Sequence, residues 1–387
     1  MNSISGRHPD SGDSITIRHA HGVICEILPG PTTQTRWLGP GLVDIQVNGY
    51  QGKDLNAGAF DAHTVLQLAQ GMQRVGVSTF LPTLITASED SIVNGLQAIR
   101  AARAADPIVA RMIPYVHIEG PSLSPESGPR GAHPLEHIRP PDLAEFQRWQ
   151  AACGGLVGML TISPHWDDSA AFIAALHAAG THVAIGHTHA SAQQIRAAVD
   201  AGARLSTHLG NGAHGTLRRH PNYLWTQLAE DRLYASFIAD GHHLPVDTLK
   251  VMLRAKGLER SILVSDTAAL GGMPPGVYEH PIGGKVSLSA DGRLSVMDTE
   301  FLAGATLPLT AGIAHVVDHL GMPLAAALKM ATANPGQFVG GRGVLAVGAA
   351  ADLMRFEWDG PGQPIVVDTL LVAGQTVFDA HTSKNVI

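Results

Sequence analysis

Residues 182–211 read HVAIGHTHASAQQIRAAVDAGARLSTHLGN, and this stretch decides the fold. His182–Ile185 and Arg204–Ser206 are short runs that predict two strands. Between them, Ser191–Ala201 has a helical pattern and opens with Ser191 and Gln194 at the spacing of a capping box. A strand, a helix and a second strand in succession predict a βαβ unit with parallel strands.

The same alternation continues along most of the chain. Two further helical patterns lie at Ala62–Val75 and Ser88–Ala105. Strands separated by helices are typical of the α/β class, and eight such strands favour a closed (β/α)8 barrel of the TIM type over an open sheet. The eight predicted strands are Leu42–Val47, Val77–Leu84, Met112–Ile118, Leu156–Ile162, His182–Ile185, Arg204–Ser206, Leu233–Ala239 and Ile262–Val264.

The two ends of the chain have a different pattern. After helical patterns at Leu307–Leu320 and Leu324–Thr332, the tail consists of short β runs separated by Gly and Pro, and the first forty residues are also β-like. We expect residues 1–40 and 345–387 to pair into a small β-sandwich domain beside a barrel of residues 41–344. Residues 122–141, rich in Gly, Pro and charges, predict a long loop over the barrel mouth.

The composition is that of a large globular protein. Its 387 residues are 45% hydrophobic and 15% charged, enough apolar material for a large core. The net charge of −7 argues against a nucleic-acid partner. The two cysteines, Cys25 and Cys153, cannot build a disulfide framework, and neither a signal segment nor a membrane-spanning run is visible. We therefore expect a cytoplasmic protein without membrane contact.

Histidine is unusually frequent, because the 21 histidines outnumber Phe, Tyr and Trp together. Histidine is the commonest metal ligand in proteins, so this frequency favours a metalloenzyme. Barrels of this type build their active sites at the carboxyl ends of the strands, and the predicted strands here end in polar residues. These residues are Gln46, Asn48, Glu119, His187, His189, His208, Asp240, His242, His243 and Asp266.

A single polar residue at a strand end is more often structural than functional, but the joint pattern suits a divalent metal ion with a nearby base. Imidazole nitrogen and carboxylate oxygen both suit zinc. His187 and His189 form an H-x-H pair that would fit two metals, although we favour His189 as a residue of the rim. Asp266 fits either a helix N-cap or the catalytic base, and we favour the base.

The motifs VHIEGP, GHTHA, STHLGN, IADGHH, LVSDTAA and FLAGAT occur in an order that resembles the N-acetylglucosamine-6-phosphate deacetylases of the amidohydrolase superfamily. PGLVDIQVNG near the start and GVLAVGAAADL in the tail are also similar to that family. The resemblance implies that Glu119, His187 and His208 bind the metal and that Asp266 is the catalytic acid and base. The first strand carries Gln46 and Asn48 where many superfamily members have H-x-H. Neutral amides are poor zinc ligands, so this difference implies one metal ion.

The resemblance also implies a set of substrate contacts. Asn211 and Gly212 match an Asn-Ala pair whose backbone faces a phosphate, and Arg219 matches a phosphate-binding arginine. The HLGNGAH sequence departs from the family's usual H-x-x-N-A-M, which leaves the sugar and its phosphate open. The remaining implied contacts are Ala132, His133, His243, Leu302, Ala303 and Gly304.

The expected activity is hydrolysis of the acetamide of N-acetylglucosamine 6-phosphate by a homodimer that holds one divalent ion per chain, with zinc as the first candidate. Iron, cobalt and manganese can share such ligands. The alternative is the same chemistry on another N-acetyl amino sugar or on an N-acyl-D-amino acid. A non-catalytic sugar-phosphate sensor is the other class of function, but a sensor would not need Asp266.

Overall fold

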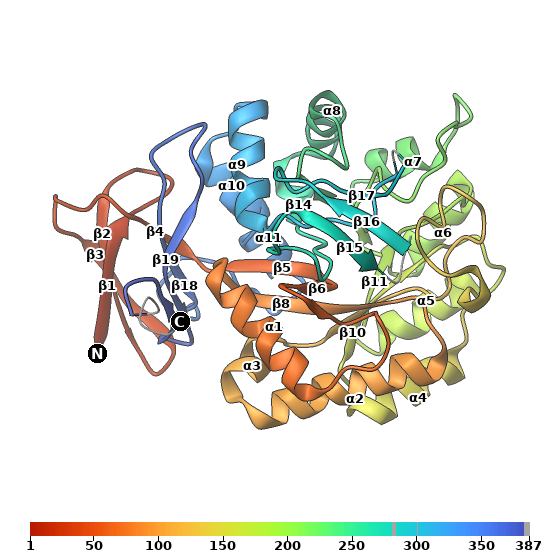
Figure 1. Cartoon of the computed structure of the whole chain (residues 1–387), viewed down its shortest axis with the longest axis horizontal. Coiled ribbons are helices and arrows are strands. Elements are labelled where there is room, and N and C mark those ends of the chain that lie inside the picture. Colours follow the sequence, from red (N-terminus) through yellow and green to blue (C-terminus); the bar gives the residue numbers. More distant parts are fainter. Residues whose placement is uncertain (281–283, 300, 383–387) are drawn as a thin grey trace.

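The computed structural model describes residues 1–280, 284–299 and 301–382, and a barrel of eight parallel strands is its centre (Figure 1). The last strand returns to the first, because the backbone N–H of Asp266 donates to the carbonyl of Gln46 at 3.0 Å and Val47 bridges Thr267. This closure confirms the predicted (β/α)8 class. The barrel strands are β5 (Leu42–Val47), β8 (Val77–Ile85), β9 (Val116–Glu119), β10 (Val157–Ile162), β11 (His182–Ile185), β12 (Leu205–Ser206), β13 (Tyr234–Ile238) and β14 (Ser261–Val264).

Helices follow the barrel strands and bury their apolar faces against the sheet. The capping box predicted from the sequence is present at α6, where Ser191 and Gln194 exchange side-chain and backbone hydrogen bonds. The helices are α1 (Ala62–Arg74), α2 (Glu89–Ala105), α3 (Pro107–Met112), α4 (Leu143–Cys153), α5 (Ser169–Ala178), α6 (Ala192–Ala201), α7 (Tyr223–Ala229), α8 (Val246–Lys256), α9 (Leu309–Leu320), α10 (Leu324–Met330) and α11 (Ala333–Gly336), with 3₁₀ turns at Leu135–His137 and Leu258–Arg260.

The prediction of a strand from Met112 was wrong at its start. Residues up to Met112 belong to α3, and β9 begins only at Val116. Asp106 caps α3 through the N–H groups of Ile108 and Val109, and Pro107 occupies its first turn. Proline has no N–H to lose at that position and its fixed φ suits a helix start, so these two residues favour a helix over an early strand.

Strands from both ends of the chain form one sheet of seven strands, in which the N-terminal and C-terminal strands lie side by side (Figure 1). Its outermost strand β3 approaches the segment before β18, because Ile24 and Ala349 share a backbone hydrogen bond. The sheet thus curves around its own core, which contains Ile17, Leu38 and Leu353, as expected for the small β domain. The strands are β1 (Asn2–Arg7), β2 (Ser14–Ala20), β3 (Val23–Pro29), β4 (Trp37–Pro40), β18 (Leu353–Glu357), β19 (Val366–Val372) and β20 (Gln375–Asp379).

Two smaller sheets were not predicted. One joins β6 (Gly49–Tyr50) to β7 (Lys53–Asp54) directly after the first barrel strand. The other joins β15 (Gly276–His280), β16 (Gly284–Leu288) and β17 (Leu294–Val296) after the last barrel strand. No helix in the part of the chain that the structure describes is long and apolar enough to span a membrane.

Candidate active site

A cavity of about 400 Å³ opens at the carboxyl ends of the barrel strands. Loops after several strands contribute to its wall, including the predicted loop of residues 122–141, which supplies Ala132 and His133. Of the site residues expected from the sequence, those that line the cavity are Glu119, Ala132, His133, His187, His208, Asn211, Gly212, His243, Asp266, Leu302, Ala303 and Gly304.

Glu119, His187 and His208 meet at the floor of this cavity. Nε2 of His208 lies 2.8 Å from Oε1 of Glu119, and Nε2 of His187 lies 3.3 Å from the same oxygen. The two imidazole Nε2 atoms are 3.2 Å apart. All three side chains are buried, so a carboxylate oxygen and two ring nitrogens converge on one small volume away from bulk water.

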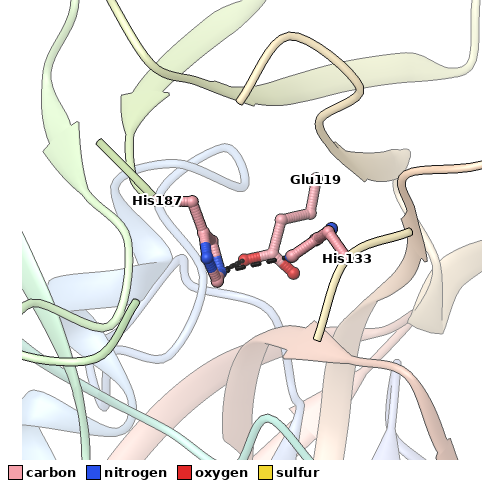
Figure 2. A group of neighbouring side chains, drawn as sticks. All are labelled: Glu119, His133 and His187. Atoms are coloured by element: carbon pink, nitrogen blue, oxygen red, sulfur yellow. Dashed lines mark hydrogen bonds and ion pairs between the residues drawn. The ribbon is translucent and has the colours of Figure 1, made fainter. Parts of the chain in front are cut away.

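His133 joins the same group, and in Figure 2 the side chains of Glu119, His133 and His187 point toward one another. The hydroxyl of Thr86 donates to the carbonyl of Glu119 and therefore accepts from Nδ1–H of His133. Nδ1–H of His187 donates to the carbonyl of Pro129 at 2.7 Å. In a neutral ring only one nitrogen carries the proton, so both Nε2 atoms present lone pairs.

The Nε2 lone pairs of His133 and His187 face each other across 3.2 Å, and a cation bound by both would stabilise this arrangement. The ligand atoms of Glu119, His133 and His187 lie within 4.8 Å of one another, which makes them a possible metal-binding site. His208 contacts the carboxylate of Glu119 through its Nε2 atom. The donor set therefore fits a divalent metal ion that accepts both nitrogen and oxygen ligands.

The pKa values of His208 and Glu119 agree with a site that binds a cation. Burial opposes a charge on His208, but the hydrogen bond to Glu119 and its negative charge raise the pKa of His208 to about 9. Burial likewise opposes a charge on Glu119, yet the hydrogen bond from His208 and the nearby imidazole of His187 hold its pKa well below the usual range. Glu119 thus needs a positive partner, whether a proton or a metal ion.

Asp266 lies beside this group and is partly buried in the cavity wall. Its Oδ1 accepts a hydrogen bond from Nδ2 of Asn48 at 2.6 Å. Burial is the main reason why the pKa of Asp266 rises to about 6, and the charge of Glu119 adds to it, while His208 works against it. A partly buried carboxyl that titrates near neutral pH suits a residue that both accepts and returns a proton.

The backbone is strained at three of these residues. His187, His208 and Asp266 each follow a barrel strand and have φ angles of 46°, 26° and 50°. Non-glycine residues seldom adopt positive φ, and such strain tends to occur where a site requires a particular side-chain direction. The turn after each strand therefore directs a functional side chain into the cavity.

Gly212 illustrates how closely the loops approach the histidines. Its φ is +59°, and a Cβ atom there would lie 2.6 Å from Nδ1 of His187. A side chain at this position would therefore press on His187, so the close approach favours glycine.

Arg219 is the expected site residue that does not line the cavity. It lies in the exposed segment between Gly215 and Pro221, ahead of α7. Among the described residues that line the cavity, Arg219 is absent.

His189 and His242, which the sequence left without a role, do not line the cavity either. Nδ1 of His189 lies 2.6 Å from the hydroxyl of Ser124, and Nε2 of His242 lies 3.1 Å from the carbonyl of Asp291. The contact of His189 fits the rim position expected for it, whereas the sequence led to no prediction for His242.

Sequence reasoning missed several residues of the cavity wall. Asn56 joins the wall while bonding the backbone of Thr83 and Ile85, and Phe301 lines the cavity although it is largely exposed. Asn56 lies in the unpredicted segment after β7, so no strand end indicated it. Asn48 was noticed as a strand-end residue, but its hydrogen bond to Asp266 depends on closure of the barrel.

The chain matches the amidohydrolase family over residues 37–377. It is 31% identical to the N-acetylglucosamine-6-phosphate deacetylase of Bacillus subtilis, covering 81% of this chain and 79% of the relative. It is 33% identical to the N-acetylgalactosamine-6-phosphate deacetylase of Escherichia coli O157:H7, covering 86% and 87%. The crystal structure of N-acetyl-D-glucosamine-6-phosphate deacetylase from Mycobacterium smegmatis superimposes with a TM-score of 0.86 at 28% identity, covering 98% of this chain and 100% of that one. The chain therefore belongs to the amidohydrolase family and, within it, to the family of the N-acetylglucosamine-6-phosphate deacetylases.

Proposed function

We propose that this protein hydrolyses the acetamide of N-acetylglucosamine 6-phosphate to glucosamine 6-phosphate and acetate. The observation that carries the proposal is the convergence of Glu119, His187 and His208 beside the carboxyl of Asp266 in one cavity. A ligand set next to a base is what amide hydrolysis requires, and the named relatives share this chemistry.

The proposed cofactor is one divalent ion, with zinc as the first candidate, held by Glu119, His187 and His208. When bound, such an ion supplies a Lewis acid that polarises the amide carbonyl and lowers the pKa of water. His133 stands close enough to serve as a further ligand or to contact the substrate. Asn48 supports a single ion, because its amide is already engaged with Asp266 and is a poor ligand for a second one.

Asp266 moves the protons in the proposed reaction. Its carboxylate takes a proton from the attacking water and then returns that proton to the departing nitrogen as the C–N bond breaks. The hydrogen bond from Asn48 to Oδ1 holds the carboxyl in place, which leaves Oδ2 for the proton. Partial burial brings its pKa toward the range in which both transfers are feasible.

The remaining wall of the cavity is proposed to hold the sugar. The loop after β9 supplies Ala132 and His133, and the turn after β13 supplies His243. The backbones of Asn211 and Gly212 come from the segment after β12. Leu302, Ala303 and Gly304 complete the wall next to Asp266. A cavity of about 400 Å³ fits a substrate of the size of one phosphorylated sugar.

Arg219 is proposed to bind the phosphate from the neighbouring subunit of a homodimer. Two observations support this proposal. Arg219 lies outside the cavity of its own chain. It is also exposed, so it can reach across a subunit interface. A guanidinium can hold a phosphate through two parallel charge-assisted hydrogen bonds.

Three general expectations remain part of the proposal. The domain boundaries at residues 40 and 345 are supported by β4 ending at Pro40 in one sheet and β5 beginning at Leu42 in the other. The net charge of −7 supports the absence of a nucleic-acid partner. A cytoplasmic location follows from the scarcity of cysteine.

A second candidate substrate is N-acetylgalactosamine 6-phosphate, because the relative named for that activity is 33% identical to this chain. The test is acetate release, after reconstitution with zinc, from N-acetylglucosamine, its 6-phosphate, and the galacto and manno epimers of that phosphate. We expect the highest kcat/KM with N-acetylglucosamine 6-phosphate. A clear preference for the galacto epimer would reassign the sugar, and a lack of acetate from all four compounds would refute the proposed function.

A further inference from the structure

We propose that Asp240 is a positioning residue that keeps a proton on Nδ1 of His243, so that in the neutral ring Nε2 faces the cavity as a hydrogen-bond acceptor for the substrate. The tautomer follows from the geometry alone, whereas the identity of the substrate donor rests on the proposed function.

Asp240 lies just beyond the carboxyl end of β13 and engages the following turn with both oxygens. Its Oδ1 accepts the backbone N–H groups of His242 and His243, each at 2.9 Å. Its Oδ2 lies 2.7 Å from Nδ1 of His243. Two backbone hydrogen bonds on one oxygen leave only the other oxygen for the imidazole, so the carboxyl cannot rotate without losing all three contacts.

The charge state of Asp240 determines the donor in this contact. Burial raises its pKa, but the hydrogen bonds from His243 and from the backbone of His242 outweigh that effect, and the pKa of Asp240 stays below the usual value. An ionised carboxylate can only accept hydrogen bonds, so the proton between the two groups belongs to Nδ1 of His243. In the neutral ring Nε2 then carries the lone pair.

That lone pair is directed to the cavity. His243 lines the cavity, and its side chain is 12% exposed. Nε2 takes part in none of the hydrogen bonds found among the described residues, in contrast to Nδ1. Asp266 lines the same cavity. In its neutral form His243 thus offers an acceptor beside the reacting group.

The substrate donor is a sugar hydroxyl or the acetamide N–H. These two groups differ in one useful way, since a hydroxyl can turn and accept, whereas an amide N–H can only donate. Inverting the tautomer of His243 therefore discriminates between them.

Asp240→Asn produces this inversion. The two backbone N–H groups of His242 and His243 still require an acceptor, so the amide oxygen of the new side chain takes the place of Oδ1. Its NH₂ group then faces Nδ1 of His243, which must become the acceptor. The proton consequently moves to Nε2, and a donor now faces the cavity.

The test is ¹⁵N NMR of histidine-labelled, zinc-loaded protein without substrate, with the His243 signal assigned through His243→Gln. We expect an Nδ1–H tautomer in the wild type and an Nε2–H tautomer in Asp240→Asn. His242→Ala is the matched control, because its side chain points to Asp291 and its backbone N–H is kept, so the His243 signal should not change. An Nε2–H tautomer in the wild type, or the same tautomer in both proteins, would overturn the proposal.

Kinetics then identify the donor. If His243 accepts from the acetamide N–H, Asp240→Asn should lower kcat/KM by about 10- to 100-fold, because two donors face each other. If it accepts from a hydroxyl, the loss should stay below about 5-fold. The NMR result does not depend on turnover. If the tautomer differs between the wild type and Asp240→Asn but the wild type releases no acetate, the proposed function is refuted and the role of Asp240 is not.

Discussion

Asp266 is the residue on which the proposed chemistry depends most directly. We predict that Asp266→Asn retains the metal ion but loses about 10²- to 10⁴-fold in kcat, because an amide cannot accept the proton of the attacking water. The measurement is kcat for acetate release together with the metal content of the variant. Asp298→Asn is the control, since Asp298 also has a left-handed backbone, with φ 61°, but is exposed and does not line the cavity. Near-normal kcat in Asp266→Asn would exclude this residue as the base.

The pH dependence of the reaction follows from the same carboxyl. Asp266 acts as a base only when ionised, so activity should fall as the pH drops through its pKa and should be complete well above it. That pKa is about 6, mainly because of burial. The positive charge of a bound metal ion favours the ionised form, so the acidic limb of kcat should lie at or below pH 6. Loss of the acidic limb in Asp266→Asn would confirm its origin. An acidic limb well above pH 6 would contradict the assignment.

Among the helices, α6 offers the clearest link between sequence and stability. Ser191 accepts from the N–H of Gln194, and the side chain of Gln194 returns a bond to the N–H of Ser191. Ser191→Ala removes the first bond and should reduce the free energy of unfolding by about 1 kcal/mol. The midpoint of urea unfolding measures the loss, with exposed Gln193→Ala as a control that should change it little. Equal effects of both substitutions would mean that the cap contributes nothing specific.

The alternation of strands and helices could be predicted because each barrel strand is a short apolar run and many helices begin with a recognisable cap. The start of β9 was misplaced because apolar residues around Met112 fit a strand as well as a helix, and only the Asp106–Pro107 pair favours the helix. The three-stranded sheet β15–β17 was missed because its strands are only three to five residues long.

The candidate site was predictable where a residue ends a strand, as Glu119, His187, His208 and Asp266 do. It was not predictable where tertiary closure creates the contact. The Asn48–Asp266 hydrogen bond joins residues from the first and last barrel strands, and no local pattern indicates such a pair. The convergence of His133 on His187 likewise depends on how a long loop folds back over the barrel.

For the whole molecule, the position of Arg219 outside its own cavity leads to a prediction about assembly. Arg219→Ala should raise KM for the phosphorylated sugar by about 10- to 100-fold and leave the free sugar unaffected, because only the phosphate loses a charged partner. Mixing Arg219→Ala with Asp266→Asn should restore activity, since a hybrid dimer combines an intact Asp266 with the partner's arginine in one site. Random exchange would recover about a quarter of the wild-type sites. A lack of recovery in verified hybrid dimers would contradict a shared site, and equal losses with both sugars would indicate a structural arginine.

The central claim is that one metal ion, held by Glu119, His187 and His208, supports amide hydrolysis in this barrel. The most direct test is a zinc titration of chelator-stripped protein, followed by acetate release from N-acetylglucosamine 6-phosphate. We expect no turnover in the stripped protein. The rate of acetate release should rise linearly up to one equivalent of zinc per chain and stay constant beyond it, and His208→Ala should be inactive throughout. Turnover without metal, or a rise that continues to two equivalents, would contradict the central claim.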